Sequence, residues 1–182
     1  MVIGMSNSDP LKCDVLVIGK GMAGMSAALF AANRGLSVVQ TGMTSEIIFA
    51  SGLLDLMGVH PIKEKKVWQD PWAAIDSVVG DLSDHPYAHL TKDDISASFV
   101  EVLSFLEKEG LTYCREENDN TGMINPLGKT KVTYCVPKSM WGGVEALRKK
   151  PPCLIAGFHG LGDFSARQIV ETLKQQWPKL RA

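Results

Sequence analysis

Apolar and small residues alternate over the first forty positions in an order typical of a strand, a turn, a helix and a second strand. Val15–Ile18 is a β-branched apolar run, which predicts a strand buried on both faces. Small residues then recur at helical spacing, predicting a helix with one face thin enough to lie on a sheet: Ala23, Ala27, Ala28 and Ala31. Gly35 suits the left-handed position that ends a helix, and 36–40 predicts a second buried strand.

Further along the chain the apolar period changes twice. Asp70-Pro71 predicts a helix start, with the helix running to about Leu82, and Thr91–Asp94 predicts the cap of a second helix that ends at Gly110. From Leu111 the period is that of strands, at 111–116, 121–124 and 131–136, with turns at 118–120 and 125–128. Residues 111–137 are therefore expected to form a small antiparallel meander inserted into an α/β domain.

Residues 153–177 repeat the opening pattern in outline. A strand is predicted at Cys153–Ala156, then a glycine-rich loop at 157–162, then a helix capped by Asp163. Because Asp163 would repel an anion at that helix start, the pattern favours a plain turn over a second phosphate site. His159 is a candidate acid or base in the loop, and a polar loop histidine without a catalytic role explains it equally well.

Composition narrows the class of protein. The 182 residues include 19 basic and 20 acidic side chains, for a net charge of −1, which argues against a nucleic-acid or anionic-membrane surface. No stretch of about 20 apolar residues predicts a membrane span, and residues 1–11 lack signal-peptide features and predict a disordered leader before a domain at 12–182. The protein is therefore predicted to be cytoplasmic.

The cysteines carry no metal-site pattern. Four lie far apart, without a Cys-x-x-Cys pair, so no metal or iron–sulfur site is expected in this chain: Cys13, Cys114, Cys135 and Cys153. Each stands in an apolar, strand-like stretch, which predicts buried free thiols in a reducing compartment.

The strongest functional signal is Gly-x-Gly-x-x-Gly, placed where the first strand turns into the helix. Gly19 permits the tight turn, Gly21 lets the backbone approach a phosphate, and Gly24 allows close packing of helix on strand. The free amides at the helix start, at the positive end of its dipole, form an anion site. These residues are expected to contact a cofactor: Gly19, Lys20, Gly21, Met22, Ala23, Gly24 and Thr41. The fold class predicted is α/β, a Rossmann-like FAD/NAD(P)-binding fold.

Two further features bear on the cofactor. A dinucleotide site normally has Asp or Glu at the end of the second strand to hold the adenosine ribose, but this chain has the neutral Gln40. The loop that follows includes Ser51 and Gly52, whose small side chains and backbone amides are expected to border the cofactor.

Lys129 and Lys131 alternate on one strand, where an anionic substrate or plain solvation would each account for them.

Several motifs together resemble the B subunit of anaerobic glycerol-3-phosphate dehydrogenase. They occur in that family's order from residue 13 to about 176: 14–24, 51–56 (Ser-Gly-Leu-Leu-Asp-Leu), 85–87 (His-Pro-Tyr), 125–128 (Asn-Pro-Leu-Gly) and 157–164 (Gly-Phe-His-Gly-Leu-Gly-Asp-Phe). The first motif is shared by many flavoproteins, whereas the second and the last are more particular to this family.

The resemblance implies a flavin-binding subunit of an enzyme that oxidises sn-glycerol 3-phosphate to dihydroxyacetone phosphate. Electrons would pass to quinone through partner subunits, one of which carries iron–sulfur clusters, so contact with the membrane is indirect. FMN is the cofactor the family suggests, in keeping with Gln40, while the full glycine motif keeps FAD open. The resemblance covers only the first half of such a subunit, so the chain alone is expected to be inactive.

No catalytic base is assigned. His60 and His159 are the histidines considered, and neither stands in a motif that fixes a role. Two other functions fit the residues: a non-catalytic subunit that holds a flavin for electron transfer or assembly, and a nicotinamide-binding regulatory module.

Overall fold

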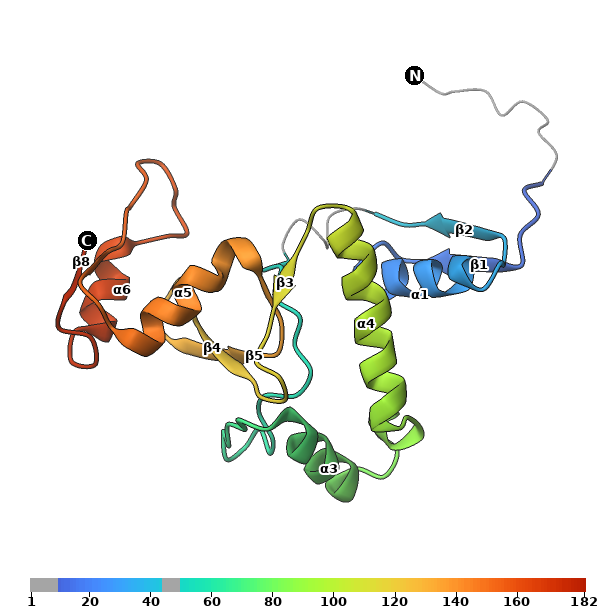
Figure 1. Ribbon diagram of the computed structural model, residues 1–182, viewed down its shortest axis with the longest axis horizontal. Coiled ribbons are helices and arrows are strands. Elements are labelled where there is room, and N and C mark those ends of the chain that lie inside the picture. The colour runs from blue at the N-terminus through green and yellow to red at the C-terminus, as the bar shows by residue number, and fades with distance from the viewer. Residues whose placement is uncertain (1–9, 44–49) are drawn as a thin grey trace. The chain divides into compact units, whose positions relative to one another are not determined.

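The computed structural model describes residues 10–43 and 50–182, which divide into two compact units, Met1–Ser51 and Gly52–Ala182. Each unit is described by itself (Figure 1). Most of the predicted leader, residues 1–9, lies outside the described residues. The assignment of 12–182 to one α/β domain stays a prediction.

The first unit contains the predicted β–α–β arrangement. Strand β1 (Val15–Ile18) leads into helix α1 (Met22–Asn33), which is followed by strand β2 (Val38–Thr41). The strands pair in parallel, with Val15 opposite Val38 and Ile18 opposite Thr41. At the start of both strands the carboxylate of Asp14 accepts hydrogen bonds from the backbone N–H (2.8 Å) and hydroxyl (2.6 Å) of Ser37, and these bonds lower the pKa of Asp14.

The burial predicted for these strands is wrong. Leu16 and Ile18 alternate to one face of β1 and are 56% and 81% exposed. The residues of β2 are only half-buried or exposed, and Ala23 and Ala27 of α1 are exposed. The reason is that β1 and β2 form a sheet of two strands within the described residues. A strand becomes buried on both faces only where both faces of its sheet are covered.

The second unit begins with two helices that the sequence predicted correctly. In α3 (Pro71–Asp81) the carboxylate of Asp70 accepts hydrogen bonds from Trp72 N and Ala73 N. Helix α4 (Lys92–Lys108) starts with a capping box in which the side chains and backbones of Thr91 and Asp94 bond reciprocally. The short 3₁₀ helix η1 (Pro86–His89) joins them.

Four short strands follow, in two separate antiparallel pairs. Strand β4 (Thr121–Ile124) pairs with β5 (Thr130–Thr133), and β3 (Tyr113–Cys114) pairs with β6 (Val136–Pro137). A continuous meander over 111–137 is therefore wrong, because β3 pairs with β6 rather than with the neighbouring β4. Its place as an insertion in an α/β domain stays a prediction.

The β4–β5 turn is fixed by a side chain. The carbonyl oxygen of the Asn125 amide accepts hydrogen bonds from the backbone N–H of Leu127 (3.0 Å) and Lys129 (2.9 Å). Gly128 has a φ of +76° and lies under α6, where a Cβ would come within 3.0 Å of Ile169 Cα. The motif at 125–128 is thus a structural turn.

The C-terminal part comprises α5 (Lys138–Lys149), β7 (Cys153–Leu154), α6 (Ala166–Leu173) and β8 (Leu180–Arg181), with β7 and β8 parallel. The predicted strand and helix are present but shorter. The cap of α6 is Ser165, whose hydroxyl accepts from Gln168 N (3.2 Å), and not Asp163 as predicted. Both side chains can accept such a bond, and Ser165 directly precedes the first helical residue.

Two aromatic residues centre the main packing clusters of this unit. Tyr134 meets Trp72 and Phe99 edge to face, with ring centroids 6.1 and 5.3 Å apart. Trp177 is buried among apolar residues of α6 and β8, and its indole N–H donates to Pro151 O (2.7 Å). No helix among the described residues has both the length and the apolar character that crossing a bilayer requires.

The four cysteines are free, as predicted, but only Cys135 is buried. The other three are partly exposed: Cys114 and Cys153 stand in two-residue strands of two-stranded sheets, and Cys13 precedes β1. Cys135 is packed beside Leu54, with which its backbone pairs. Burial raises the pKa of the Cys135 thiol from an ordinary value near 9 to about 11.

Replacing Ile75 by alanine tests the core of the second unit. Ile75 is 4% exposed in the Tyr134 cluster, so Ile75→Ala is expected to lower the free energy of unfolding by about 2–5 kcal/mol, measured by urea denaturation. The matched control is Ile62→Ala, because Ile62 is 79% exposed and a surface change of this kind stays within about 0.5 kcal/mol. Equal losses in the two variants would contradict the assigned core.

Alkylation tests the burial of Cys135. Because only the thiolate reacts, a pKa near 11 predicts that iodoacetamide at pH 8 modifies Cys135 about a hundredfold more slowly than a thiol with the ordinary value. The rate should rise as the pH approaches 11. Mass spectrometry follows each cysteine separately, with Cys153 as the internal comparison. In denaturant the four should react alike, and equal rates in the folded chain would contradict the prediction.

Candidate active site

The glycine motif forms a tight turn at the carboxyl end of β1. Gly19 has a φ of +131°, and its N–H donates to Thr41 O at 2.8 Å. A Cβ at Gly24 would lie 2.3 Å from Gly19 O, a contact no side chain tolerates. Gly42, with a φ of +149°, closes the other side, where a Cβ would come 3.1 Å from Gly19 Cα. This geometry agrees with the structural roles predicted for the two residues, a tight turn at Gly19 and close packing of helix on strand at Gly24.

Helix α1 begins at this turn without a capping side chain. Gly21 is the N-cap residue, and among the described residues no side chain caps the helix start and no acidic residue stands in its first turn. The first backbone amides of a helix have no partner within the helix and lie at the positive end of its dipole. The amides of Met22, Ala23 and Gly24 thus form a candidate anion site, with no competing carboxylate in the first turn of the helix.

Gln40 has a role that the sequence did not predict. Its side-chain Nε2 donates to Gly19 O at 2.9 Å, so the residue at the end of β2 braces the glycine turn. The side-chain amide is therefore bonded to the protein's own backbone. In a dinucleotide-binding protein an acidic side chain normally stands at this position and binds the ribose. The sequence signal for this role was that residue 40 is a glutamine. Its neutral amide can donate a hydrogen bond to a carbonyl, whereas a carboxylate cannot.

The remaining predicted contacts divide between the units. Lys20 lies in the turn, and Thr41 takes part through its carbonyl. Gly52, the first residue of the second unit, has a φ of +77° and accepts a hydrogen bond from the Tyr113 hydroxyl (2.8 Å). The expected place of Ser51 and Gly52 beside the cofactor stays a prediction.

The candidate acid–base and cationic residues belong to the second unit and are mostly engaged. His60 Nε2 lies 2.8 Å from Asp81 Oδ2, and Lys131 pairs with Asp55 at 2.6 Å. His159 stands in the exposed loop before α6. No group of three or more His, Cys, Asp or Glu side chains in the described part of the chain is arranged to hold a metal ion.

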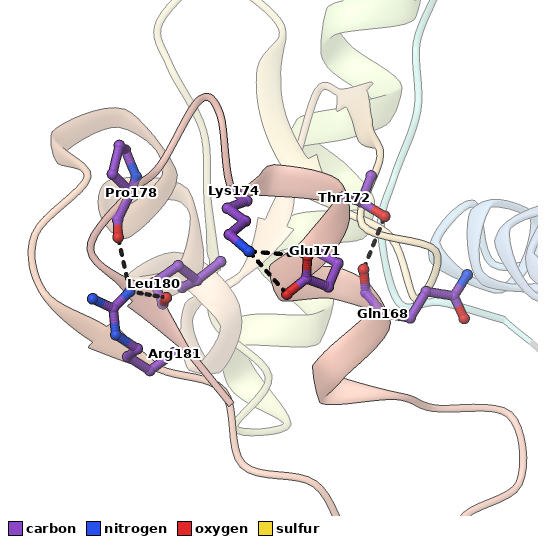
Figure 2. Close-up of polar contacts among 7 residues, drawn as sticks. All are labelled: Gln168, Glu171, Thr172, Lys174, Pro178, Leu180 and Arg181. Carbon is purple, nitrogen blue, oxygen red and sulfur yellow. Dashed lines mark hydrogen bonds and ion pairs between the residues drawn. The ribbon is translucent and has the colours of Figure 1, made fainter.

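A hollow of about 560 Å³ beside α6 and β8 is lined by three basic residues, but two of them already have partners. Figure 2 shows the Arg181 guanidinium donating to Pro178 O and Leu180 O, each at 2.8 Å. Lys174 lies 3.3 Å from Glu171, and Arg167 is the third basic residue. The three basic side chains are exposed, and Arg181 and Lys174 bond to residues close to them in the sequence. The hollow is therefore a weaker candidate for a ligand site than the glycine turn.

The geometry of the first unit suits the phosphate end of a cofactor. The glycines leave room for a group to approach the backbone, and the α1 amides are donors for its oxygens. A strand–glycine turn–helix with these properties is typical of proteins that bind the phosphate of a nucleotide or flavin on a Rossmann-type fold.

Comparison with known proteins identifies the class. Residues 14–181 match the family described as FAD binding domain, and the chain belongs to this family. The family match therefore indicates that the cofactor of this chain is a flavin. No solved structure matches it.

The resemblance to one group of relatives is also confirmed. The chain is 28% identical to the B subunit of anaerobic glycerol-3-phosphate dehydrogenase from Pectobacterium carotovorum subsp. carotovorum (strain PC1), over 91% of this chain and 40% of that protein. In Vibrio vulnificus (strain YJ016) the protein of the same name is 32% identical over 68% of this chain and 28% of that protein. The chain thus spans at most about two fifths of these relatives' length.

Gly24→Ala tests the close approach in the turn. Because the added methyl would meet the Gly19 carbonyl, a backbone atom that cannot move aside, the variant is expected to lose about 1–3 kcal/mol of stability in the first unit. Hydrogen exchange of the β1 and α1 amides measures the effect. The matched control is Gly80→Ala, because Gly80 is helical with open space around it and alanine favours a helix. Unchanged protection in Gly24→Ala would contradict the geometry.

Proposed function

We propose that this chain belongs to the flavin-binding subunit of a quinone-linked dehydrogenase that oxidises sn-glycerol 3-phosphate to dihydroxyacetone phosphate. The relatives named as the B subunit of anaerobic glycerol-3-phosphate dehydrogenase support this, and their designation as one subunit of an enzyme implies partner subunits. In the proposal one partner carries iron–sulfur clusters and passes electrons to quinone. The protein works in the cytoplasm and reaches the membrane only through those partners.

The single observation that carries the proposal is the uncapped start of α1 behind the Gly19 turn. The amides of Met22, Ala23 and Gly24 would hold a phosphate of the flavin, and the bond from Gln40 to Gly19 O keeps the turn in place. When bound, the flavin supplies a hydride acceptor for the carbon that bears the substrate hydroxyl.

The ribose position bears on which flavin is bound. The family description names FAD, whereas Gln40 is engaged with the glycine turn instead of offering an acid to an adenosine ribose. FMN has no adenosine ribose, so its binding does not require an acidic residue at position 40. We propose FMN as the physiological cofactor, with FAD as the alternative that the titration below separates.

A second candidate function has a specific observation in its favour. Of the residues that build the glycine turn, only Lys20 carries a titratable side chain, and the described turn offers no carboxylate or imidazole as a base. A subunit that holds a flavin for electron transfer or assembly, and depends on a partner for substrate oxidation, would have this composition.

Changing the charge at the helix start tests flavin binding. Ala23 is exposed in the first turn of α1, so Ala23→Asp introduces a carboxylate that favours the helix dipole and repels a phosphate. The affinity for FMN or FAD is expected to fall at least about tenfold, equivalent to 1.4 kcal/mol, while the helix is not weakened. The isosteric control is Ala23→Asn. Titration of the full chain follows absorbance at about 370 and 450 nm, bands that belong to the flavin ring.

The same titration separates the alternatives. Tighter binding of FMN than of FAD supports the cofactor proposed, and equal affinity of the Asp and Asn variants would overturn the phosphate site. A rise in melting temperature with NADH, with no response to either flavin, would favour the nicotinamide module. Bleaching of bound flavin by glycerol 3-phosphate under anaerobic conditions supports an intrinsic dehydrogenase, whereas bleaching only with the partner subunits favours the flavin-holding function.

A further inference from the structure

Two tyrosine hydroxyls hold the two ends of the segment 52–56. The Tyr113 hydroxyl donates to Gly52 O at 2.8 Å, and the Tyr87 hydroxyl donates to Leu56 O at 2.9 Å. Tyr113 belongs to β3 and Tyr87 to η1, so the segment is bonded to two separate elements of the second unit. Burial raises the pKa of both phenols, so both hydroxyls stay protonated and act as donors at neutral pH.

Gly52 lies against the strand pair to which Tyr113 belongs. Tyr113 is opposite Pro137 in the β3–β6 pair, and a Cβ at Gly52 would lie 3.5 Å from Pro137 Cγ. Gly52 has a φ of +77°, a left-handed conformation that glycine adopts readily and other residues adopt only at a cost. The turn at Gly52 is thus defined by its glycine backbone, by the Pro137 ring and by the Tyr113 hydroxyl.

The position of Gly52 in the chain connects this turn with the proposed function. Strands β1 and β2 are parallel, so their carboxyl ends lie at one edge of the sheet, where the glycine turn at Gly19 is found. Folds with parallel strands bind their ligands beside the segments that leave the carboxyl ends of those strands. The chain that leaves β2 enters the second unit at Gly52. This connection is the reason that Ser51 and Gly52 are expected to border the flavin.

We propose that Tyr113 is a positioning residue for the flavin, and that it acts by holding the backbone of the Gly52 turn. The inference rests on the proposed function, in which Ser51 and Gly52 border the cofactor. Because the peptide group is planar, a hydrogen bond to Gly52 O fixes the orientation of the whole peptide between Gly52 and Leu53. Tyr113 acts through this peptide, since its own hydroxyl proton is already bound to Gly52 O.

Tyr113→Phe is the first test, because it removes the hydroxyl and keeps the ring. The affinity of the full chain for FMN or FAD, measured by absorbance titration, is expected to fall about three- to tenfold, the range that one hydrogen bond accounts for. The matched control is Tyr87→Phe. This control loses the same kind of hydroxyl–carbonyl bond at the other end of the same segment, at Leu56, and its flavin affinity is expected to equal that of the unmodified chain.

The pair of variants separates positioning from a general loss of stability. Each variant loses one hydrogen bond, so urea denaturation is expected to show similar losses of stability, whereas only Tyr113→Phe is expected to weaken flavin binding. Flavin affinity that is unchanged in Tyr113→Phe, or reduced equally in both variants, would overturn the positioning role and leave the proposed function standing. An unmodified chain that binds neither FMN nor FAD would overturn the proposed function, and this inference with it.

Gly52→Ala changes the same turn through its backbone. The added methyl has room, since it would lie 3.5 Å from Pro137 Cγ, but alanine disfavours the φ of +77°. Flavin affinity is therefore expected to fall at least as much as in Tyr113→Phe. The matched control is Gly110→Ala, because Gly110 has a φ of +85°, follows α4 and has open space around it. Equal flavin affinity in the two alanine variants would contradict a Gly52 turn that borders the flavin, and so the role of Tyr113.

Discussion

The close approach of Gly24 to the Gly19 carbonyl is the constraint on which the first unit depends. Gly19 O lies where any side chain at Gly24 would be, and the same oxygen accepts the hydrogen bond from Gln40. The N–H of Gly19 is meanwhile bound to Thr41 O. One peptide region thereby connects the end of β1, the first turn of α1 and the end of β2. The direction of the α1 amides, and with it the candidate anion site, follows from this connection.

In the second unit a comparable role belongs to the pairing of Leu54 with Cys135. Leu54 N donates to Cys135 O (3.0 Å), and Cys135 N donates back to Leu54 O (2.9 Å). This exchange holds the segment after Ser51-Gly52 against the residue that precedes β6, and Leu56 lies in the cluster around Tyr134. The motif at 51–56 therefore has a structural reason within its own unit.

Local signals explain what the sequence predicted well. The caps at Asp70 and Thr91 consist of hydrogen bonds between residues two or three positions apart, and the glycine turn is equally local. Pairing of β3 with β6 joins residues more than twenty positions apart, so periodicity could not distinguish it from a meander. Burial of β1 depends on what covers the sheet, which a run of β-branched residues does not specify.

Side-chain roles were the harder part of the site. Asn120 belongs to a polar stretch expected to be a turn, yet it is almost fully buried and bridges Met57 and Trp68. Gln40 stands where a dinucleotide site normally has an acid, and its side chain supports the backbone 21 residues earlier. In both cases the side-chain amide donates to a backbone carbonyl that is distant in the sequence. Which carbonyl it meets depends on the three-dimensional arrangement, so the sequence pattern could not predict it.

The two-stranded sheet of the first unit has a consequence for the behaviour of the chain in solution. Among the described residues β1 and β2 pair only with each other, so each has an outer edge of backbone donors and acceptors, beside the exposed Leu16 and Ile18. An edge that stays uncovered can add a further strand, from the same molecule or from another. Where nothing else covers these edges, we therefore expect self-association through strand addition to increase with the concentration of the chain.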